Sequence, residues 1–364
     1  MNPDPRQFFK RQITLAEIGE AGQEKLLHAS VAIVGCGGLG NAAAAYLAGS
    51  GIGLLHLVDF DRVDASNLHR QVFYSYQDIG KPKCQVLAAH LTKISPFARI
   101  SYTEMALDKK TIFSELEDYE LIVDCTDSLP VKYLLNDYCV LTGKVLVYGS
   151  LYKHDGYVAA FNVPSEKGFT ANLRDAFPAM PKDRVPNCSE IGTLNPIVGM
   201  IGILQANEVI KLVTGAGKPL TDRLLIYNTM ENSQFFMKLR PVMDREKIET
   251  IFASETYFDA GCHLQDPDLL IGPDQLRKQL QKGEVEILSV IDDASLILPF
   301  EVQSSIPASA FDADLLETSP DKDLVVVCKK GISSYAVTRI IKERHPLARV
   351  FSLEGGLEAF NSSK

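Results

Sequence analysis

The chain has 364 residues, which suits two domains, and its 46% hydrophobic and 23% charged residues are typical of a soluble globular protein. Acidic residues outnumber basic ones by 46 to 37, and the resulting net charge of −9 disfavours a broad nucleic-acid surface. The sequence lacks an uninterrupted apolar stretch of membrane length and a signal-peptide pattern, and its seven scattered cysteines suit reduced thiols. We therefore expect a cytoplasmic protein that binds neither membranes nor nucleic acid.

The first part of the chain alternates short apolar strands with helices, which predicts a parallel α/β sheet. Strands are expected at 30–34, 54–59, 121–124 and 145–149, and helices at 39–50, 83–93, 131–142 and 196–213. This first domain is assigned residues 1–242.

The texture of the sequence changes after residue 242. Residues 243–265 are charged and predict a linker. A second, smaller α/β domain is expected over 266–364. Its strands are predicted at 286–290, 324–327 and 349–352, and its helices at 275–280 and 334–344.

A glycine-rich turn, Gly35-Cys36-Gly37-Gly38-Leu39-Gly40, follows the first strand and opens a helix. Glycines there let backbone N–H groups approach an anion, and a helix N-terminus favours negative charge. Asp59 ends the next strand, where a carboxylate can bind ribose hydroxyls. The combination predicts a nucleotide-binding site, for which NAD is the common ligand.

The residues beyond Asp59 favour a different chemistry. Asn67, Arg70 and Lys83 supply an amide and two cations, and Asp127 follows the strand at 121–124. Hydride transfer needs no such cations, whereas cleavage between α- and β-phosphates does, because charge builds up on the leaving pyrophosphate. A carboxylate at Asp127 suits a magnesium ion that bridges phosphates. An NAD-dependent oxidoreductase stays as the alternative enzyme.

These residues resemble the MoeB/ThiF/HesA adenylyltransferases, relatives of ubiquitin-activating enzymes. The resemblance runs from about Phe8 to Arg240 and rests on Arg11-Gln12, Gly35–Gly40, Asp59–Asp61, Ser66–Gln71, Gly80–Lys83, Asp124–Asp127 and Asn187–Gly192. It implies a Rossmann-like sheet that uses ATP and Mg²⁺ to adenylate the C-terminal glycine of a ubiquitin-like sulfur carrier of the MoaD/ThiS type. A carrier-binding scaffold without activity is the non-enzyme alternative.

Carried over by position, the resemblance implies a role for each matching residue. Gly37 and Gly38 cradle phosphate, and Asp59 holds the ribose. Asn67, Arg70 and Lys83 bind the triphosphate, and Asp127 serves magnesium. Gly35, Asp61 and Gln71 complete the nucleotide-binding set. Arg11 reaches the ATP of another subunit, so a homodimer is implied.

The sequence departs from the family at its zinc lobe. Members usually bind zinc through two C-x-x-C pairs, one after each of two late strands, but 166–177 and 240–246 contain no cysteine here. We expect no structural zinc, and we expect apolar packing around Phe169, Phe177 and Met180 in its place. Ser128 stands where an Asn commonly follows Asp127, a change that we expect to be tolerated.

Cys188 lies in a polar loop, Asn187-Cys188-Ser189-Glu190, just before a long helix. A thiol near helix N-termini and bound cations is a candidate nucleophile, and a small buried packing residue is the alternative. The matching family cysteine is proposed to form a covalent bond with the carrier. Cys36, Cys84, Cys125 and Cys139 are expected to be simply buried.

Cys328 stands between a buried strand and a helix, in Cys328-Lys329-Lys330-Gly331-Ile332-Ser333-Ser334. Backbone N–H groups and the two lysines favour a thiolate there. The segment resembles the C-x-x-G-x-x-S loop of rhodanese sulfurtransferases, and residues 305–308 and 352–360 resemble that fold's other motifs. Asp292-Asp293 lacks the usual arginine.

The resemblance implies that Cys328 carries sulfur as a persulfide, which converts the adenylated carrier to a thiocarboxylate. A persulfide donor such as a cysteine desulfurase is an implied partner, and a docking domain without activity is the alternative. The pathway served, whether molybdopterin, thiamine, tRNA thiolation or one that forms cysteine, stays open.

Overall fold

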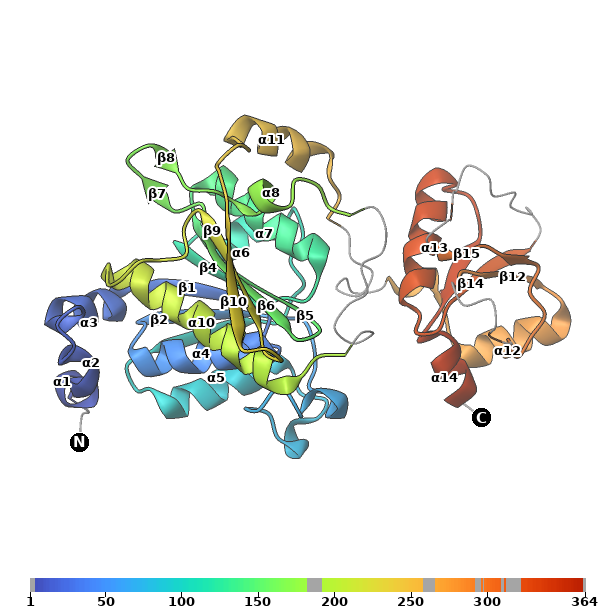
Figure 1. Cartoon of the computed structure of the whole chain (residues 1–364). Coiled ribbons are helices and arrows are strands. Elements are labelled where there is room, and N and C mark those ends of the chain that lie inside the picture. Colours follow the sequence, from blue (N-terminus) through green and yellow to red (C-terminus); the bar gives the residue numbers. More distant parts are fainter. Residues whose placement is uncertain are drawn as a thin grey trace. The chain divides into compact units, whose positions relative to one another are not determined.

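The computed structural model describes residues 4–181, 192–257, 266–291, 296, 298–308, 311 and 322–362. They form two compact units (Figure 1), the first made of 4–181 and 192–257 and the second of the described residues from 266 onward.

The first unit is built on an eight-stranded sheet in the order β10-β9-β6-β5-β4-β1-β2-β3. Five strands run parallel: β1 (Ser30–Val34), β2 (Leu54–Val58), β3 (Arg99–Thr103), β4 (Leu121–Asp124) and β5 (Val145–Tyr152). Three antiparallel strands extend it: β6 (Asp155–Phe161), β9 (Arg223–Asn228) and β10 (Ser233–Lys238). The α/β class with a Rossmann-like parallel sheet is thereby confirmed.

Helices cover both faces of this sheet (Figure 1), with α4, α5 and α10 grouped on one side and α6, α7 and α11 on the other. The helices of the first unit are α1 (Pro5–Phe8), α2 (Lys10–Ile13), α3 (Gly19–His28), α4 (Gly38–Ser50), α5 (Lys83–Ile94), α6 (Ile112–Leu116), α7 (Leu129–Thr142), α8 (Leu173–Ala176), α10 (Asn195–Thr214) and α11 (Arg245–Ser254). Short elements are η1 (Ala65–Asn67), η2 (Tyr76–Asp78) and the hairpin β7 (Pro164–Ser165) and β8 (Gly168–Phe169).

Helix α10 is long and apolar enough to cross a membrane by length and composition, but it packs inside the first unit. It lies against α4 and against β5 and β6, and Ile197, Val198 and Ile201 are buried there. A Cβ on Gly202 would lie 2.4 Å from the carbonyl oxygen of Leu39, so only glycine permits this close approach to α4.

The second unit holds a five-stranded parallel sheet in the order β11-β15-β14-β12-β13. Its strands are β11 (Leu270–Ile271), β12 (Val285–Ser289), β13 (Ser304–Ser305), β14 (Asp323–Val327) and β15 (Val350–Leu353). Its helices are η3 (Pro267–Leu269), α12 (Pro273–Lys282), α13 (Ile332–Arg344) and α14 (Gly356–Ser362). The buried strand residues form a core of their own.

Part of the predicted linker is helical, which corrects the sequence interpretation. Helix α11 lies within 243–265 and packs on α7. Asp244 caps its N-terminus, Ile248 is its one buried residue, and Lys109 donates hydrogen bonds to the carbonyls at its C-terminus, including that of Glu255 at 3.0 Å. One buried position in three turns gives too weak a periodicity for the sequence to reveal this helix.

Candidate active site

The ends of three neighbouring strands define the candidate site. Strand β1 lies between β2 and β4, and Val34 pairs with Val58 on one side and with Asp124 on the other. The chain segments that begin at Gly35, Asp59 and Cys125 therefore leave the sheet at one edge. This is the edge at which parallel α/β sheets bind their ligands.

The glycine turn after β1 uses its glycines for two purposes. Gly35 has φ 95°, and a Cβ there would lie 2.7 Å from the carbonyl oxygen of Cys125. A Cβ on Gly38 or Gly40 would also clash, with Val198 and with the carbonyl oxygen of Gly35. Gly37 differs, because within 4 Å its Cβ would meet only Nε2 of Gln71, at 3.6 Å. The turn thus leaves open space at the N-cap of α4, which fits a bound phosphate.

Asp59 is held by the backbone around it. Its Oδ2 accepts a hydrogen bond from the N–H of Cys36 at 2.6 Å, and its Oδ1 accepts one from the N–H of Asp61 at 2.7 Å. Burial raises the pKa of Asp59 to about 6, although the charge of Lys83 and these hydrogen bonds oppose the shift. The carboxylate is therefore oriented at the sheet edge, as a ribose acceptor must be.

Lys83, the first residue of α5, is 5% exposed, and its Nζ lies 2.6 Å from Oδ2 of Asp61. Burial alone would lower the pKa of Lys83, but Asp61, Asp59 and Asp127 together raise it. The ammonium thus stays charged at the edge of the sheet. Asp61, which the resemblance places among the nucleotide-binding residues, contacts Lys83 directly and orients it.

Asn67, the last residue of η1, forms one hydrogen-bonded group with Arg70 and Gln71 on the segment that follows. Oδ1 of Asn67 accepts from Nη2 of Arg70 at 3.0 Å and from Nε2 of Gln71 at 3.2 Å. Gln71 is 3% exposed, and its Oε1 is buried with no hydrogen-bond partner among the described residues. An unpaired buried acceptor beside Gly37 fits a ligand that brings a donor.

Asp127 is exposed, three residues after the end of β4. The loop that carries it is fixed by Asp124, whose buried carboxylate pairs with Nζ of Lys132 at 3.1 Å and accepts from Thr126. Ser128 caps α7 by accepting from the N–H of Val131, which is a physical reason for serine to serve at that position.

The exposed Asp127 carboxylate fits the oxygen chemistry of magnesium. In the part of the chain that the structure describes, no three His, Cys, Asp or Glu side chains cluster as a metal site. A magnesium ion at Asp127 would therefore take further oxygens from phosphates, as it commonly does.

Arg11 lies apart from these residues. Its neighbour Gln12 donates to the carbonyl of Ser50, the last residue of α4, at 3.0 Å. Helix α4 has 13 residues, so Gly38 lies about 20 Å away along the helix axis. The fold therefore does not bring Arg11 to the glycine turn of its own chain.

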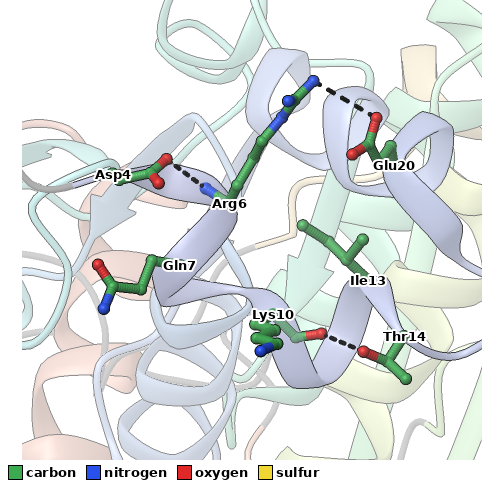
Figure 2. Close-up of a pocket in the computed structure, with 7 residues that line it drawn as sticks. All are labelled: Asp4, Arg6, Gln7, Lys10, Ile13, Thr14 and Glu20. Carbon is green, nitrogen blue, oxygen red and sulfur yellow. Dashed lines mark hydrogen bonds and ion pairs between the residues drawn. The ribbon is translucent and has the colours of Figure 1, made fainter.

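A hollow of about 460 Å³ lies among α1, α2 and the start of α3 (Figure 2). Figure 2 shows Arg6 reaching towards Glu20, with which it is paired at 3.5 Å, and both side chains are exposed. The hollow contains none of the predicted nucleotide-binding residues and adds nothing to the candidate site.

Sequence reasoning missed Asn195, the first residue of α10. Its Nδ2 donates to the carbonyl of His69 at 2.8 Å and so holds the segment that carries Arg70. An Asn beside a helix-opening Pro is a sequence signal, but its partner lies 126 residues away.

The segment expected to replace a zinc lobe is held by polar contacts, so the expected apolar packing is wrong. Phe169 and Phe177 are 48% and 41% exposed. Instead, Oδ1 of Asp175 accepts from the N–H groups of Val242 and Met243 at 2.7 and 2.8 Å. These bonds join the segment after β6 to the segment after β10, the two places where the family carries its C-x-x-C pairs.

Further contacts strengthen this junction and the helix α8 that carries Asp175. Asn172 donates to the carbonyl of Met243 at 3.1 Å and forms a capping box with Asp175 at α8. The buried guanidinium of Arg174 makes a two-pronged ion pair with Asp137 at 2.6 and 2.7 Å, and Tyr257 also donates to this carboxylate. The absence of structural zinc stays a prediction that elemental analysis of the purified chain tests.

Replacing Asp175 by Ala is expected to lower the free energy of unfolding of the first unit by about 1–3 kcal/mol, because two backbone donors and a helix cap lose their acceptor. Thermal unfolding followed by circular dichroism measures the change. Asp118→Ala is the matched control, since that carboxylate is exposed and outside this junction. Equal midpoints for the Asp175 variant and the wild type would contradict the proposed junction.

In the second unit, Cys328 follows β14 and is 5% exposed. Its Sγ accepts from the N–H of Gly331 at 3.1 Å and contacts Oγ of Ser334 at 3.2 Å, which in turn lies 2.9 Å from Oγ of Ser352. A Cβ on Gly356 would lie 2.6 Å from the carbonyl oxygen of Cys328. Donors and close packing therefore hold the sulfur at the start of α13.

The other predicted thiols divide into two groups. Cys36, Cys84, Cys125 and Cys139 are buried, and burial raises the pKa of each thiol, so these four suit packing. Cys188 lies outside the described residues, as do Asp292 and Asp293.

A family model described as the ThiF family matches residues 9–248. The chain belongs to the ThiF family. The matched region contains Arg11, the glycine turn and every residue of the candidate site described above except the second unit's Cys328.

Relatives are similar over one or both units. A "sulfur carrier protein adenylyltransferase" of Thermus thermophilus is 41% identical over 64% of this chain and 85% of its own length. A "probable adenylyltransferase/sulfurtransferase MoeZ" of Mycobacterium tuberculosis is 32% identical over 97% of this chain and 92% of its own. An "adenylyltransferase and sulfurtransferase MOCS3" of Drosophila grimshawi is 33% identical over 97% and 83%.

Solved structures agree in fold. A crystal structure of E. coli MccB matches this ThiF-family chain with a TM-score of 0.58 at 23% identity, over 66% of this chain and 73% of MccB. PaaA matches with a TM-score of 0.56 at 21% identity, over 66% and 76%. At these identities the likeness shows the fold alone.

Proposed function

We propose that this enzyme adenylates the C-terminal carboxylate of a small ubiquitin-like sulfur carrier protein with ATP. The proposal rests on one observation: the open turn at Gly37, the oriented Asp59 carboxylate and the charged Lys83 lie together at one edge of the sheet. Relatives that are named as adenylyltransferases, at 32–41% identity, support it.

The reaction needs a site of this charge. A carboxylate oxygen of the carrier attacks the α-phosphorus, the bond to the bridging β-phosphate oxygen breaks, and pyrophosphate leaves with the electron pair. Lys83 and Arg70 stabilise the charge that develops on the leaving group, and the turn at Gly37 orients the phosphates. Asp59 accepts hydrogen bonds from the ribose. Asp127 would hold a Mg²⁺ ion, which neutralises phosphate charge when bound.

The position of Arg11 favours a homodimer. Because Arg11 lies at the far end of α4 from the glycine turn, it can contact a nucleotide only in the site of a second copy. The proposed active enzyme therefore has two sites, each completed by the partner's N-terminal helices.

The second unit is proposed to be a rhodanese-like sulfurtransferase domain. Its parallel sheet and the donors around Cys328 support a bound persulfide. The outer sulfur of the persulfide attacks the carrier's acyl-adenylate and displaces AMP, which forms an acyl disulfide with Cys328. A second thiol then attacks Sγ of Cys328, forms a disulfide with it, and releases the carrier as a thiocarboxylate. Cys188 is proposed to form a covalent bond with the carrier during these steps. A cysteine desulfurase is the proposed sulfur donor, and the cytoplasm is the proposed compartment.

ATP–pyrophosphate exchange measured against a panel of ubiquitin-like carriers from the same organism tests the proposal. Exchange should depend on one carrier and on its terminal glycine, so the same carrier without that glycine is the control. If no carrier supports exchange at enzyme concentrations that bind ATP, the adenylation proposal is wrong and the carrier-binding scaffold is the alternative that stays.

The pH dependence of kcat/KM for ATP is expected to follow Asp59. This ratio reports the free enzyme, and burial raises the pKa of Asp59 to about 6, so ionised acceptor is lost as pH falls through that value. We expect a decrease of roughly fivefold to tenfold between pH 7 and pH 5.

Asp59→Asn separates this effect from the titration of ATP itself. The amide cannot ionise, so kcat/KM for ATP should be lower in the variant than in the wild type at pH 7 and should fall less as the pH is lowered. An unchanged acid limb in Asp59→Asn would assign the pH dependence to another group.

A further inference from the structure

The buried phenol of Tyr74 lies where three segments of the candidate site meet. Tyr74 is 6% exposed, and its Oη lies 2.6 Å from the carbonyl oxygen of Cys36 in the glycine turn. It also lies 3.2 Å from the carbonyl oxygen of Lys83, at the start of α5. Tyr74 itself follows the segment that carries Arg70. The Tyr74 side chain thus links the segment that carries Arg70 to the glycine turn and to the start of α5.

The phenol is the donor in both contacts. Carbonyl oxygens only accept hydrogen bonds, so the single O–H proton of Tyr74 serves the closer carbonyl, that of Cys36, with the carbonyl of Lys83 as a weaker second acceptor. Burial raises the pKa of Tyr74 far above its ordinary value, so the hydroxyl keeps its proton at every working pH.

These contacts fix the direction of the N–H of Gly37. The described peptide bonds are all trans, and in a trans peptide the C=O and the following N–H point to opposite sides. Because the carbonyl of Cys36 points at Tyr74, the N–H of Gly37 points away from it. The turn is also uncrowded at Gly37, since a Cβ there would meet only Nε2 of Gln71 within 4 Å.

Asn41 holds the same carbonyl from α4. Asn41 is 1% exposed, and its Nδ2 donates to the carbonyl oxygen of Cys36 at 3.0 Å. Its Oδ1 accepts from the N–H of Phe73 at 3.1 Å, which ties the segment of Arg70 to α4. Two buried donors on one carbonyl leave the Cys36–Gly37 peptide a single orientation.

We propose that Tyr74, with Asn41, is a positioning residue for nucleotide binding: it aims the N–H of Gly37 at a phosphate and fixes the start of α5. This role rests on the proposed function for the identity of the nucleotide. Tyr74 acts through the turn and touches no reacting atom.

Tyr74→Phe tests the role, because it removes only the hydroxyl. The ATP dissociation constant, measured by equilibrium dialysis without carrier, should rise roughly fivefold to tenfold, as expected for one misdirected hydrogen bond. KM for ATP in the exchange reaction should rise in parallel, with kcat for exchange and KM for the carrier changed less than twofold. Tyr76→Phe is the matched control, since Tyr76 lies on the same segment, 78% exposed and outside the site.

A second variant keeps the test decisive if the first loses stability. Asn41→Ala should weaken ATP binding in the same sense, and the double variant should lose less than the product of the two single losses, because both donors act on one carbonyl. If Tyr74→Phe binds ATP within twofold of wild type, whether or not its melting midpoint falls, the role inferred for Tyr74 is wrong and the proposed function still stands. A wild-type chain that binds no ATP would overturn the proposed function as well.

Discussion

Lys83→Ala is expected to lower the rate of carrier-dependent ATP–pyrophosphate exchange by a factor that corresponds to about 2–4 kcal/mol of transition-state stabilisation. The reason is structural. The ammonium is 5% exposed and lies among three carboxylates, so it is already oriented and desolvated before the nucleotide binds. Its loss removes one of the cations that stabilise the charge on the leaving pyrophosphate. Exchange rates at saturating carrier measure the effect.

Arg70→Ala and Asp127→Ala should show losses of the same order, because both residues are proposed to serve the same triphosphate. Lys81→Ala is the matched control, since Lys81 lies two residues from Lys83 but pairs with Asp78 on the surface. Near-normal exchange in two of the three site variants would contradict the proposed adenylation function.

The sequence can predict those parts of the candidate site that the topology of a parallel sheet controls. Gly35, Asp59 and Asp127 each follow a short apolar strand, and parallel strands deliver their carboxyl ends to one edge. Lys83 and Arg70 were predicted from the spacing of motifs within about 25 residues of Asp59. In each case a local pattern carried the information.

The sequence could not predict contacts between distant segments of irregular structure. The hydrogen bond from Asn195 to the carbonyl of His69 and those from Val242 and Met243 to Asp175 join residues more than 60 positions apart. Such bonds leave no periodic trace, because a single polar side chain looks the same whether it is solvated or buried. The expected apolar packing around Phe177 failed for this reason.

Cys328→Ala is expected to leave ATP–pyrophosphate exchange within twofold of wild type and to abolish sulfur transfer to the carrier. Exchange should persist because Cys328 belongs to a unit with its own sheet and core. Transfer should fail because the sulfur that accepts from Gly331 and contacts Ser334 is the proposed carrier atom. Carrier thiocarboxylate, quantified by mass spectrometry after incubation with each sulfur donor, is the measurement.

The donor itself distinguishes two chemistries at this loop. Thiosulfate would transfer its outer sulfur to the Cys328 thiolate and release sulfite, whereas a protein persulfide would transfer sulfur and release a thiol. The sequence lacks the usual arginine near Asp292, and a site short of one cation should prefer the protein persulfide to the dianionic thiosulfate. Cys139→Ala is the control, since that thiol is fully buried in the first unit. If Cys328 gains about 32 mass units, one sulfur atom, from neither donor, the second unit is a docking module, and the sulfur of the thiocarboxylate must come from another protein.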